Sequence, residues 1–235
     1  MDPSRPGPPP HRAAVAQVFV ADLSTPELDD ETFHHLSRVL RLRAGQTVCA
    51  ADGLGRWRPT VFTGGTVLDP SGEPVVVDRA EPRLTVGFVP VKGDRPELVV
   101  QKLTEIGVDH VVVCASDRSV VRWEGERAVR HMDRLRRVAR EAAQQCRRLW
   151  LPTVEHGDLD DLASDGTVMA DMGGRDLTAG DRGVVVGPEG GWTDAERQRF
   201  QAVSLGEHVL RAETAAIAAG VLMTALRRGN TSAVR

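Results

Sequence analysis

The sequence has few cysteines, few lysines and no long apolar run, and each shortage argues against a class of protein. Cys49, Cys114 and Cys146 lie at unrelated spacings without a CxxC pair, which argues against a disulfide framework and against a zinc site. We expect three small buried hydrophobic residues and no metal. The longest apolar run, residues 215–223, is far shorter than the ~20 residues that cross a bilayer, so we expect no membrane partner.

A secretory signal is also missing. The first residues, MDPSRPGPPPHR, carry prolines where a signal peptide needs an apolar stretch. We therefore expect residues 1–14 to be a disordered leader and the protein to be cytoplasmic. With 41% hydrophobic and 27% charged residues, the chain has the composition of a globular protein. Its length of 235 residues suits one large domain or two modest ones, and we expect two.

The charge pattern leaves the question of nucleic-acid binding open. A net charge of −3 argues against indiscriminate binding. Of the 30 basic residues, however, only Lys92 and Lys102 are lysines. The planar arginine side chain pairs with phosphate at two points and stacks on bases, which is compatible with RNA contact. Genome base composition is the simpler explanation for most of these arginines.

The chain changes character near residues 81–93. Before them, strand-like runs separated by Gly and Asp clusters predict a small β-rich domain of the barrel type with one helix at 30–40. After them, helices alternate with strands, which is typical of an α/β layer with a parallel sheet. The expected strands are 15–20, 47–51, 57–62, 75–78, 84–89, 111–114, 167–170 and 183–186, and the expected later helices are 99–106, 126–146 and 213–228.

A strand, a glycine-rich loop and a helix start follow one another at residues 184–196. Three valines run into GPEGGW, and Thr193 with Glu196 forms a capping box. Open α/β sheets place ligands at such turns, and glycines let the backbone approach a ligand closely. A tight connection with nothing bound is the simpler interpretation, but three glycines and a proline in five residues exceed what it needs.

Phosphate is not the ligand that this loop predicts. A Walker loop requires GxxxxGK[ST], whereas no lysine follows these glycines and Glu189 lies among them. A carboxylate repels phosphate and suits hydroxyl, amino or sulfonium groups. The loop therefore favours a ligand that carries one of those groups.

A second polar turn, LGEHVLRAETA at residues 205–215, predicts a strand, a turn and the start of the final helix, with Glu213 or Thr214 as its cap. Taken alone, Arg211 and Glu213 would be a surface ion pair worth ~0–1 kcal/mol. The helix that follows is apolar on nearly every side, so it must be buried in the core or against a second subunit. We therefore expect 187–192 and 205–215 to close over one small-molecule site.

Further polar segments are candidates for contact with RNA. In HHLSRVLRLR at residues 34–43, the arginines are suited to phosphate, although a solvated surface explains them equally well. His34 and His35 point in different directions on a helix and make a poor metal site. Residues 101–107 and 144–148 are polar stretches of two helices, for which solvated faces are the simpler interpretation.

Together these segments resemble the RsmE family of the SPOUT class, bacterial methyltransferases that modify N3 of a uridine in small-subunit ribosomal RNA. The most specific matches are GPEGGWTDAE at 187–196 and LGEHVLRAETAAIAA at 205–219, and further support comes from 34–46 and 101–108. The resemblance covers nearly the whole chain. It implies a PUA-like β-barrel for RNA over 15–80, an α/β SPOUT methyltransferase domain with a trefoil-knotted parallel sheet over 81–235, and a homodimer.

The resemblance also implies S-adenosylmethionine as the methyl donor and 16S ribosomal RNA, or the small ribosomal subunit, as the partner. One departure from the family is the absence of an arginine just before Phe19, for which Arg12 is the candidate replacement. The implied RNA-binding residues are Arg38, Arg41, Arg43, Lys102, Gln145 and Arg147. The resemblance places the cofactor on 187–191 and 205–215 and on a third loop near 170–174, where the match is weaker. The implied cofactor-binding residues are Met172, Gly187, Pro188, Glu189, Gly190, Gly191, Leu205, Gly206, Val209, Leu210, Arg211, Thr214 and Ala215.

Methylation at N3 of uridine requires loss of a weakly acidic proton and stabilisation of the anion that remains. The catalytic hypothesis is that Arg211 stabilises this charge, while Glu213 or Glu189 assists proton removal or orients the donor. Two alternatives stay open at this point. One is a SPOUT methyltransferase acting on another RNA, at a transfer RNA base or a ribose, and the other is a non-catalytic RNA-binding ribosome-assembly factor.

Overall fold

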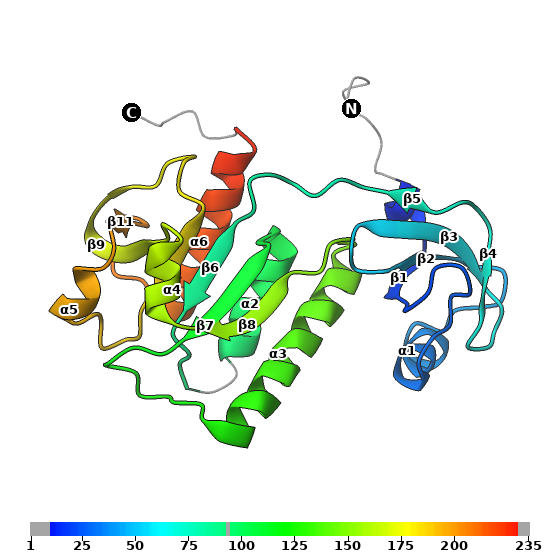
Figure 1. The fold of residues 1–235 in the computed structure, drawn as a ribbon. Coiled ribbons are helices and arrows are strands. Elements are labelled where there is room, and N and C mark those ends of the chain that lie inside the picture. Colours follow the sequence, from blue (N-terminus) through cyan, green and yellow to red (C-terminus); the bar gives the residue numbers. More distant parts are fainter. Residues whose placement is uncertain (1–9, 93–94, 230–235) are drawn as a thin grey trace. The chain divides into compact units, whose positions relative to one another are not determined.

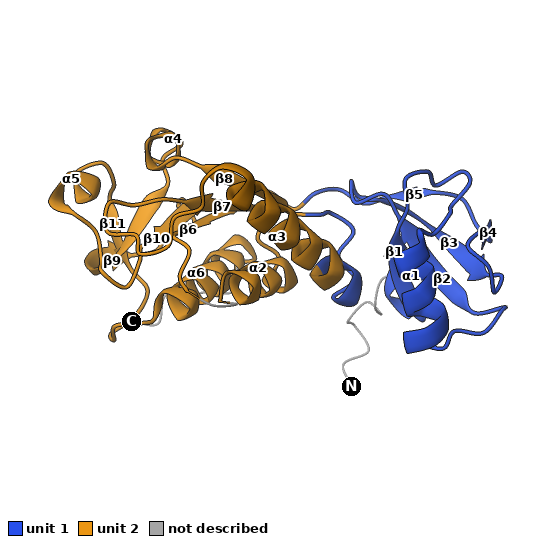
Figure 2. Ribbon diagram, turned by 90° about the horizontal axis from the view of Figure 1, so that it is seen from below, with its two compact units in different colours: residues 1–79, 143–151 blue, residues 80–142, 152–235 orange. Residues whose placement is uncertain are grey.

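The structure is a computed structural model that describes residues 10–92 and 95–229 (Figure 1). The chain divides into two compact units: unit 1 comprises residues 1–79 and 143–151, and unit 2 comprises residues 80–142 and 152–235 (Figure 2). A segment from the middle of the chain thus groups with the N-terminal one, whereas the sequence predicted contiguous domains. Of the expected leader, residues 10–13 form a 3-10 helix and His11 packs edge-on against Trp57; residues 1–9 lie outside the described residues.

Unit 1 contains a five-stranded sheet, a short 3-10 helix at residues 10–13 and a longer helical segment at residues 30–39. The strands run in the order β1-β2-β3-β4, and β5 pairs with β3. Only the β1–β2 pair is parallel. Asp29 begins the helical segment by accepting a hydrogen bond from the Thr32 amide, so the predicted helix is confirmed. The elements are η1 (Pro10–Ala13), β1 (Ala16–Phe19), α1 (Asp30–His34), η2 (His35–Val39), β2 (Thr47–Ala51), β3 (Arg56–Phe62), β4 (Leu68–Pro70) and β5 (Val75–Val76).

Unit 2 is built on a six-stranded parallel sheet in the order β11-β9-β10-β6-β7-β8. The predicted strand at 84–89 is therefore the first strand of this sheet and not part of the β-rich unit. The elements are β6 (Thr85–Phe88), α2 (Arg95–Ile106), β7 (His110–Cys114), α3 (Gly125–Gln145), β8 (Thr153–Gly157), α4 (Leu159–Ser164), β9 (Val168–Asp176), β10 (Gly183–Val186), α5 (Asp194–Arg197), β11 (Ala202–Ser204) and α6 (Ala212–Arg227).

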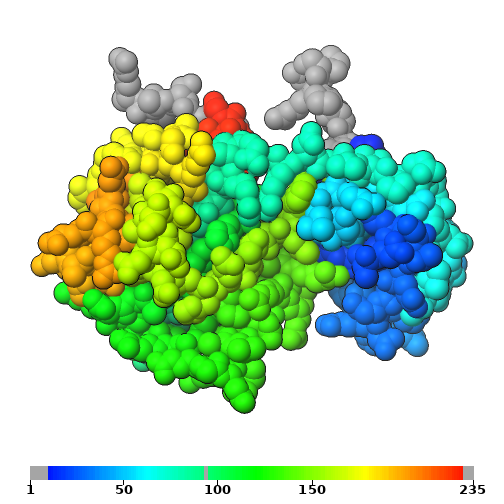
Figure 3. Space-filling view, viewed as in Figure 1, coloured from blue at the N-terminus to red at the C-terminus, as the bar shows by residue number. Residues whose placement is uncertain are grey.

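Helices cover both faces of this sheet. Apolar residues of α2, α3 and α6 pack with Val86 and Val184 on one face, while α4 and the segment around Trp192 pack with Val185 on the other. Strand β10 lies inside the sheet and all four of its residues are buried, which explains its unbroken run of valines. In the space-filling view the later strands and α5, yellow to orange, form one side of the unit (Figure 3). The predicted α/β class is confirmed.

Candidate functional site

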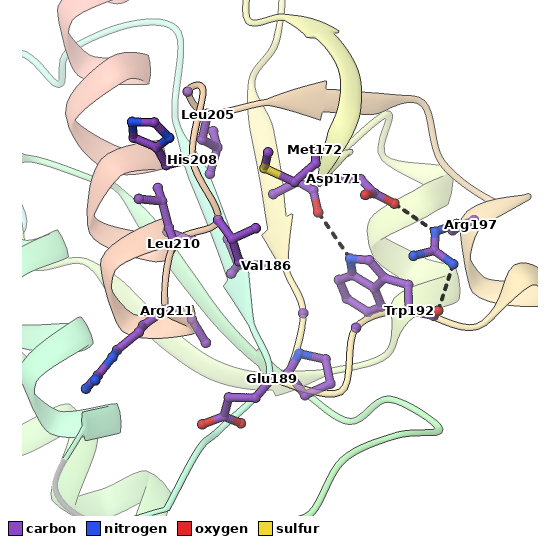
Figure 4. Close-up of a pocket in the computed structure, with 18 residues that line it drawn as sticks. Asp171, Met172, Val186, Glu189, Trp192, Arg197, Leu205, His208, Leu210 and Arg211 are labelled. Atoms are coloured by element: carbon purple, nitrogen blue, oxygen red, sulfur yellow. Dashed lines mark hydrogen bonds and ion pairs between the residues drawn. The ribbon is translucent and has the colours of Figure 1, made fainter.

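A pocket of about 410 Å³ lies at the carboxyl ends of β10 and β11 and beside the middle of β9 (Figure 4). This is the edge at which open parallel sheets bind ligands. Three segments far apart in the sequence meet there: 170–172, the glycine loop at 187–191, and the 205–211 loop. The lining residues are Ala170, Asp171, Met172, Val186, Gly187, Pro188, Glu189, Gly191, Trp192, Arg197, Leu205, Gly206, His208, Val209, Leu210, Arg211, Ala212 and Ala215.

The glycine loop is a tight turn in which two glycines have separate roles. Gly191 adopts a positive φ of 68° and its amide donates to the Pro188 carbonyl at 2.9 Å. A Cβ at Gly187 would lie 2.7 Å from the indole of Trp192, so this glycine makes room for a buried ring. The Trp192 Nε1 donates to the Ala170 carbonyl at 3.2 Å, which ties the loop to β9.

Glu196 fixes the other end of this turn. The predicted capping box with Thr193 is confirmed, and Glu196 also accepts from the Asp117 amide at 2.9 Å. Burial alone would raise the pKa of the Glu196 carboxyl, but hydrogen bonds from the backbone of Thr193 and Asp117 and from the Thr193 hydroxyl, with the charge of Arg199, hold it below its usual value. The carboxylate therefore joins the start of α5 to the segment that follows β7.

Arg197 and Asp171 form an ion pair in the pocket wall. The Arg197 Nε lies 2.7 Å from the Asp171 carboxylate, and its Nη1 donates to the Trp192 carbonyl at 3.0 Å. The hydrogen bond with Asp171 raises the pKa of Arg197 above its already high value. Because the two charges neutralise each other, Asp171 is not a free anion toward a ligand.

The 205–211 loop forms the opposite wall and differs from its prediction. Strand β11 ends at Ser204, so no strand begins at Leu205. Arg211 is the N-cap of α6 and no side chain caps the helix, so the prediction of a Glu213 or Thr214 cap is wrong. Within the described part of the chain, the backbone amides of 207–210 donate no hydrogen bond. These donors remain available to a ligand.

The three proposed catalytic residues lie at one end of the pocket or beside it. Figure 4 shows Arg211 and Glu189 at the end opposite Leu205 and His208, with their charged groups directed outward. Glu213 does not line the pocket, and it pairs with Arg95 at 3.6 Å instead of with Arg211. Arg211 forms no ion pair with any residue that the structure describes.

Most of the predicted cofactor-binding residues meet in this pocket. Every one lines it except Gly190 and Thr214. The sequence analysis did not name seven further lining residues individually, namely Ala170, Asp171, Val186, Trp192, Arg197, His208 and Ala212. Trp192 and His208 lie inside the segments 187–192 and 205–215, which the sequence predicted to close over the site. Asp171 lies in the third implied loop near 170–174, whereas Arg197 reaches the pocket only through its tertiary contact with Asp171.

The predicted RNA-binding residues fall in both units. Lys102 lies on α2 in unit 2, where its Nζ pairs with Glu105 at 2.9 Å. The other five belong to unit 1. Two of them, Arg41 and Arg147, adopt positive φ values of 53° and 63°, which non-glycine residues rarely do. The Arg147 Nη2 donates to the Val15 carbonyl at 2.7 Å, which anchors 143–151 to the start of β1.

The remaining expectations concern metals, thiols and membranes. Over residues 10–92 and 95–229, no group of three metal-ligating side chains comes together. Cys49 and Cys114 are buried, and burial raises the pKa of each thiol to about 12; Cys146 is half-buried. The described helices include none with the length and hydropathy to cross a bilayer.

Comparison with known proteins places these features in a family. Residues 79–224 match the RNA methyltransferase domain, and residues 28–64 match the RNA methyltransferase PUA domain. The ribosomal RNA small subunit methyltransferase E of Mycobacterium bovis is 31% identical over 93% of this chain and 95% of its own length. The protein of that name from Bacillus subtilis is 27% identical, covering 90% and 95%.

Solved structures agree. The ribosomal RNA small subunit methyltransferase E of Neisseria gonorrhoeae, bound to S-adenosyl methionine, superposes with a TM-score of 0.76 at 26% identity, covering 90% of this chain and 97% of that one. A putative methyltransferase from Legionella pneumophila shares the fold, with a TM-score of 0.80 at 23% identity over 89% and 97%. The chain belongs to the RNA methyltransferase family, with a SPOUT-type α/β domain and a PUA domain, and within that family to the ribosomal RNA small subunit methyltransferase E group.

Proposed function

We propose that this protein transfers the methyl group of S-adenosylmethionine to N3 of a uridine in 16S ribosomal RNA, the uracil at position 1498. The observation that carries the proposal is the pocket, because it unites the glycine loop with the 205–211 loop at the carboxyl edge of the sheet. The relatives named for ribosomal RNA methylation cover nearly all of the chain, which supports the same substrate class.

The residues present fit the donor. A volume of about 410 Å³ lies in the range of small-molecule sites, which is roughly 300–1,000 Å³. Apolar side chains, among them Val186 and Leu210, offer a surface to an adenine ring, and the unpaired amides of 207–210 offer hydrogen-bond donors. Glu189 supplies a negative charge suited to a sulfonium. Bound S-adenosylmethionine supplies a methyl group already activated by positive sulfur, so the proposal requires no metal.

The residues of the chain then have to remove the N3 proton of the uridine and stabilise the negative charge that remains on the base. Glu189 or Glu213 accepts the N3 proton of the uridine, or holds the reacting groups in line. Arg211, at the open end of the pocket and without an ion pair among the described residues, stabilises the negative charge left on the base. Bound S-adenosylmethionine would supply the methyl group to this nitrogen and would retain the carbon–sulfur bonding electrons on its sulfur.

The test uses unmethylated 16S RNA and small subunits that contain it. Each is incubated with the protein and S-adenosylmethionine carrying a labelled methyl group, and the RNA is digested and analysed by mass spectrometry. We expect 3-methyluridine at a single position. Label in a ribose, in another base or in transfer RNA would replace this proposal with the alternative SPOUT activity, and no transfer to any RNA would indicate a non-catalytic factor.

We further propose where RNA binds and how the protein assembles. Residues 15–80 form the RNA-binding domain and 81–235 the methyltransferase domain, and the protein acts as a homodimer.

The exposed apolar side chains Leu98 on α2 and Val221 on α6, which are 41% and 48% exposed, support a subunit interface there. Light scattering of Val221→Glu should report a monomer. The proposed RNA contacts are Arg38, Arg41, Arg43, Lys102, Gln145 and Arg147.

A further inference from the structure

Arg95, the first residue of α2, touches two carboxylates from different parts of unit 2. Its Nη1 lies 3.4 Å from Glu189 Oε1 in the glycine loop, and its Nε lies 3.6 Å from Glu213 Oε1 in the first turn of α6. The two carboxylates stand 24 residues apart in the sequence. One guanidinium therefore joins the two segments that close over the pocket.

The stability of α2 does not explain this position. A cation in the first turn of a helix faces the positive end of the helix dipole, which is unfavourable. The carboxylates of Glu189 and Glu213 offset that cost. Arg95 is 42% exposed, so an arginine that served only solubility could have turned into solvent. Its orientation instead follows the two acidic partners.

Glu213 depends on this contact more than Glu189 does. The Glu213 side chain is 14% exposed against 52% for Glu189. Its Oε2 is buried and has no hydrogen-bond partner within the described residues. A largely buried carboxylate with one unpaired oxygen needs a nearby positive charge, and Arg95 supplies it.

The glycine loop is also held from a second direction. Arg118, in the segment after β7, donates from Nη1 to the Gly190 carbonyl at 3.2 Å, but this contact reaches only the backbone of the loop. The Arg95 contact is different, since it reaches both the loop and α6. Loss of Arg95 should therefore release Glu189 from α6 and leave the rest of the turn in place.

We propose that Arg95 is a positioning residue that latches the glycine loop to the first turn of α6 and so holds the charged end of the pocket together. It acts through Glu189 and Glu213 and needs no contact with substrate. The expected effect on S-adenosylmethionine binding rests on the proposed function, whereas the effect on the loop itself does not.

The first experiment measures amide hydrogen exchange in the cofactor-free protein. In Arg95→Gln we expect exchange at the hydrogen-bonded amides of Gly191 and Ala215 to become roughly tenfold faster, while exchange in β10 stays unchanged. Arg95→Lys retains the positive charge but lacks the planar guanidinium with its several N–H donors, so it should keep part of the protection that Arg95→Gln loses. Arg130→Gln, which removes an exposed arginine paired with Glu126 on α3, is the matched control. Unchanged exchange at both Gly191 and Ala215 in Arg95→Gln would overturn the proposal.

The second experiment reverses the charge of Arg95. Arg95→Glu should speed exchange at Gly191 and Ala215 more than Arg95→Gln does, because a carboxylate at position 95 repels both Glu189 and Glu213. Exchange no faster in Arg95→Glu than in Arg95→Gln contradicts the latch. Calorimetry should then give a dissociation constant for S-adenosylmethionine roughly tenfold higher in Arg95→Gln than in wild type. Absence of binding in wild type would reject the proposed function and leave the exchange result standing.

Discussion

The two walls of the pocket are built in different ways. In the wall formed by the glycine loop and α5, Trp192 and Glu196 are 2% and 1% exposed and both are hydrogen-bonded to other segments. In the wall formed by the 205–211 loop, Val209 is 83% exposed, and the amides of 207–210 donate to no described residue. One wall is fixed by its own contacts, while the other leaves its polar groups to a ligand.

This difference assigns the walls different parts in binding. A wall whose polar groups are satisfied keeps its shape without the ligand, so it orients what enters. A wall with free amides and an exposed apolar side chain gains most of its contacts on binding, which is typical of segments that close over a ligand. Arg95 connects the fixed wall to the start of α6, where the second wall ends.

Among the substitutions that test this difference between the walls, Trp192→Ala should lower the free energy of unfolding the most. Removing a buried indole typically costs ~3–5 kcal/mol of unfolding free energy, and Gly187 and β9 would lose the group packed between them. Urea unfolding measures the loss. A change below about 1 kcal/mol would mean that the interlocked wall does not depend on its ring. Trp123→Ala, which removes a half-buried indole stacked on His131, is the control.

Arg211→Ala should slow turnover strongly while leaving stability intact. Loss of a group that stabilises developing charge typically slows the chemical step ~10²–10³-fold. Because Arg211 is exposed and makes no ion pair with a described residue, its removal should change S-adenosylmethionine affinity by no more than a few-fold. A methyl-transfer assay beside calorimetry separates the two quantities, and retained turnover would remove Arg211 from the mechanism.

Much of this fold follows from local pattern. The buried valines of β10, the capping box of α5 and the glycine that ends α2 each carry their signal within a few residues, and all three predictions are confirmed. Strand β8 was missed because it lies at the sheet edge, where only Val154 is buried and no apolar alternation develops. The trefoil knot stays a prediction, since strand order alone does not give the threading of the chain.

The site was predictable where it coincides with a motif and not where it depends on tertiary contact. The glycine loop and 205–215 stood out from their residues, and the resemblance supplied their ligand. The sequence suggested Arg211 as the ion-pair partner of Glu213, because the two residues are only two positions apart. That prediction is wrong, since Arg95 reaches Glu213 from another helix. The joining of 143–151 to unit 1 through Arg147 and Val15 has no local signal either.

Glu196→Gln should weaken the fixed wall in a pH-dependent way. The folded-state pKa of Glu196 is lowered, so its ionised form contributes stability above the unfolded pKa and loses it as pH falls through the folded value. At pH 7 the substitution should cost about 1–3 kcal/mol, and at acidic pH the two proteins should approach each other. Urea midpoints at both pH values test this. A constant difference would mean that shape, and not charge, is what Glu196 supplies.

Val209→Ala should have the smallest effect on stability, and it tests whether the 205–211 loop closes over the ligand. An exposed side chain contributes within about 0.5 kcal/mol to folding, so the urea midpoint should hardly move. If the 205–211 loop closes over S-adenosylmethionine, however, Val209 becomes buried in the complex, and losing two methyl groups should weaken binding by roughly three- to tenfold. Amide exchange at 207–210 should slow on binding in both proteins. An unchanged affinity together with unchanged exchange would mean that both walls are fixed before the ligand arrives.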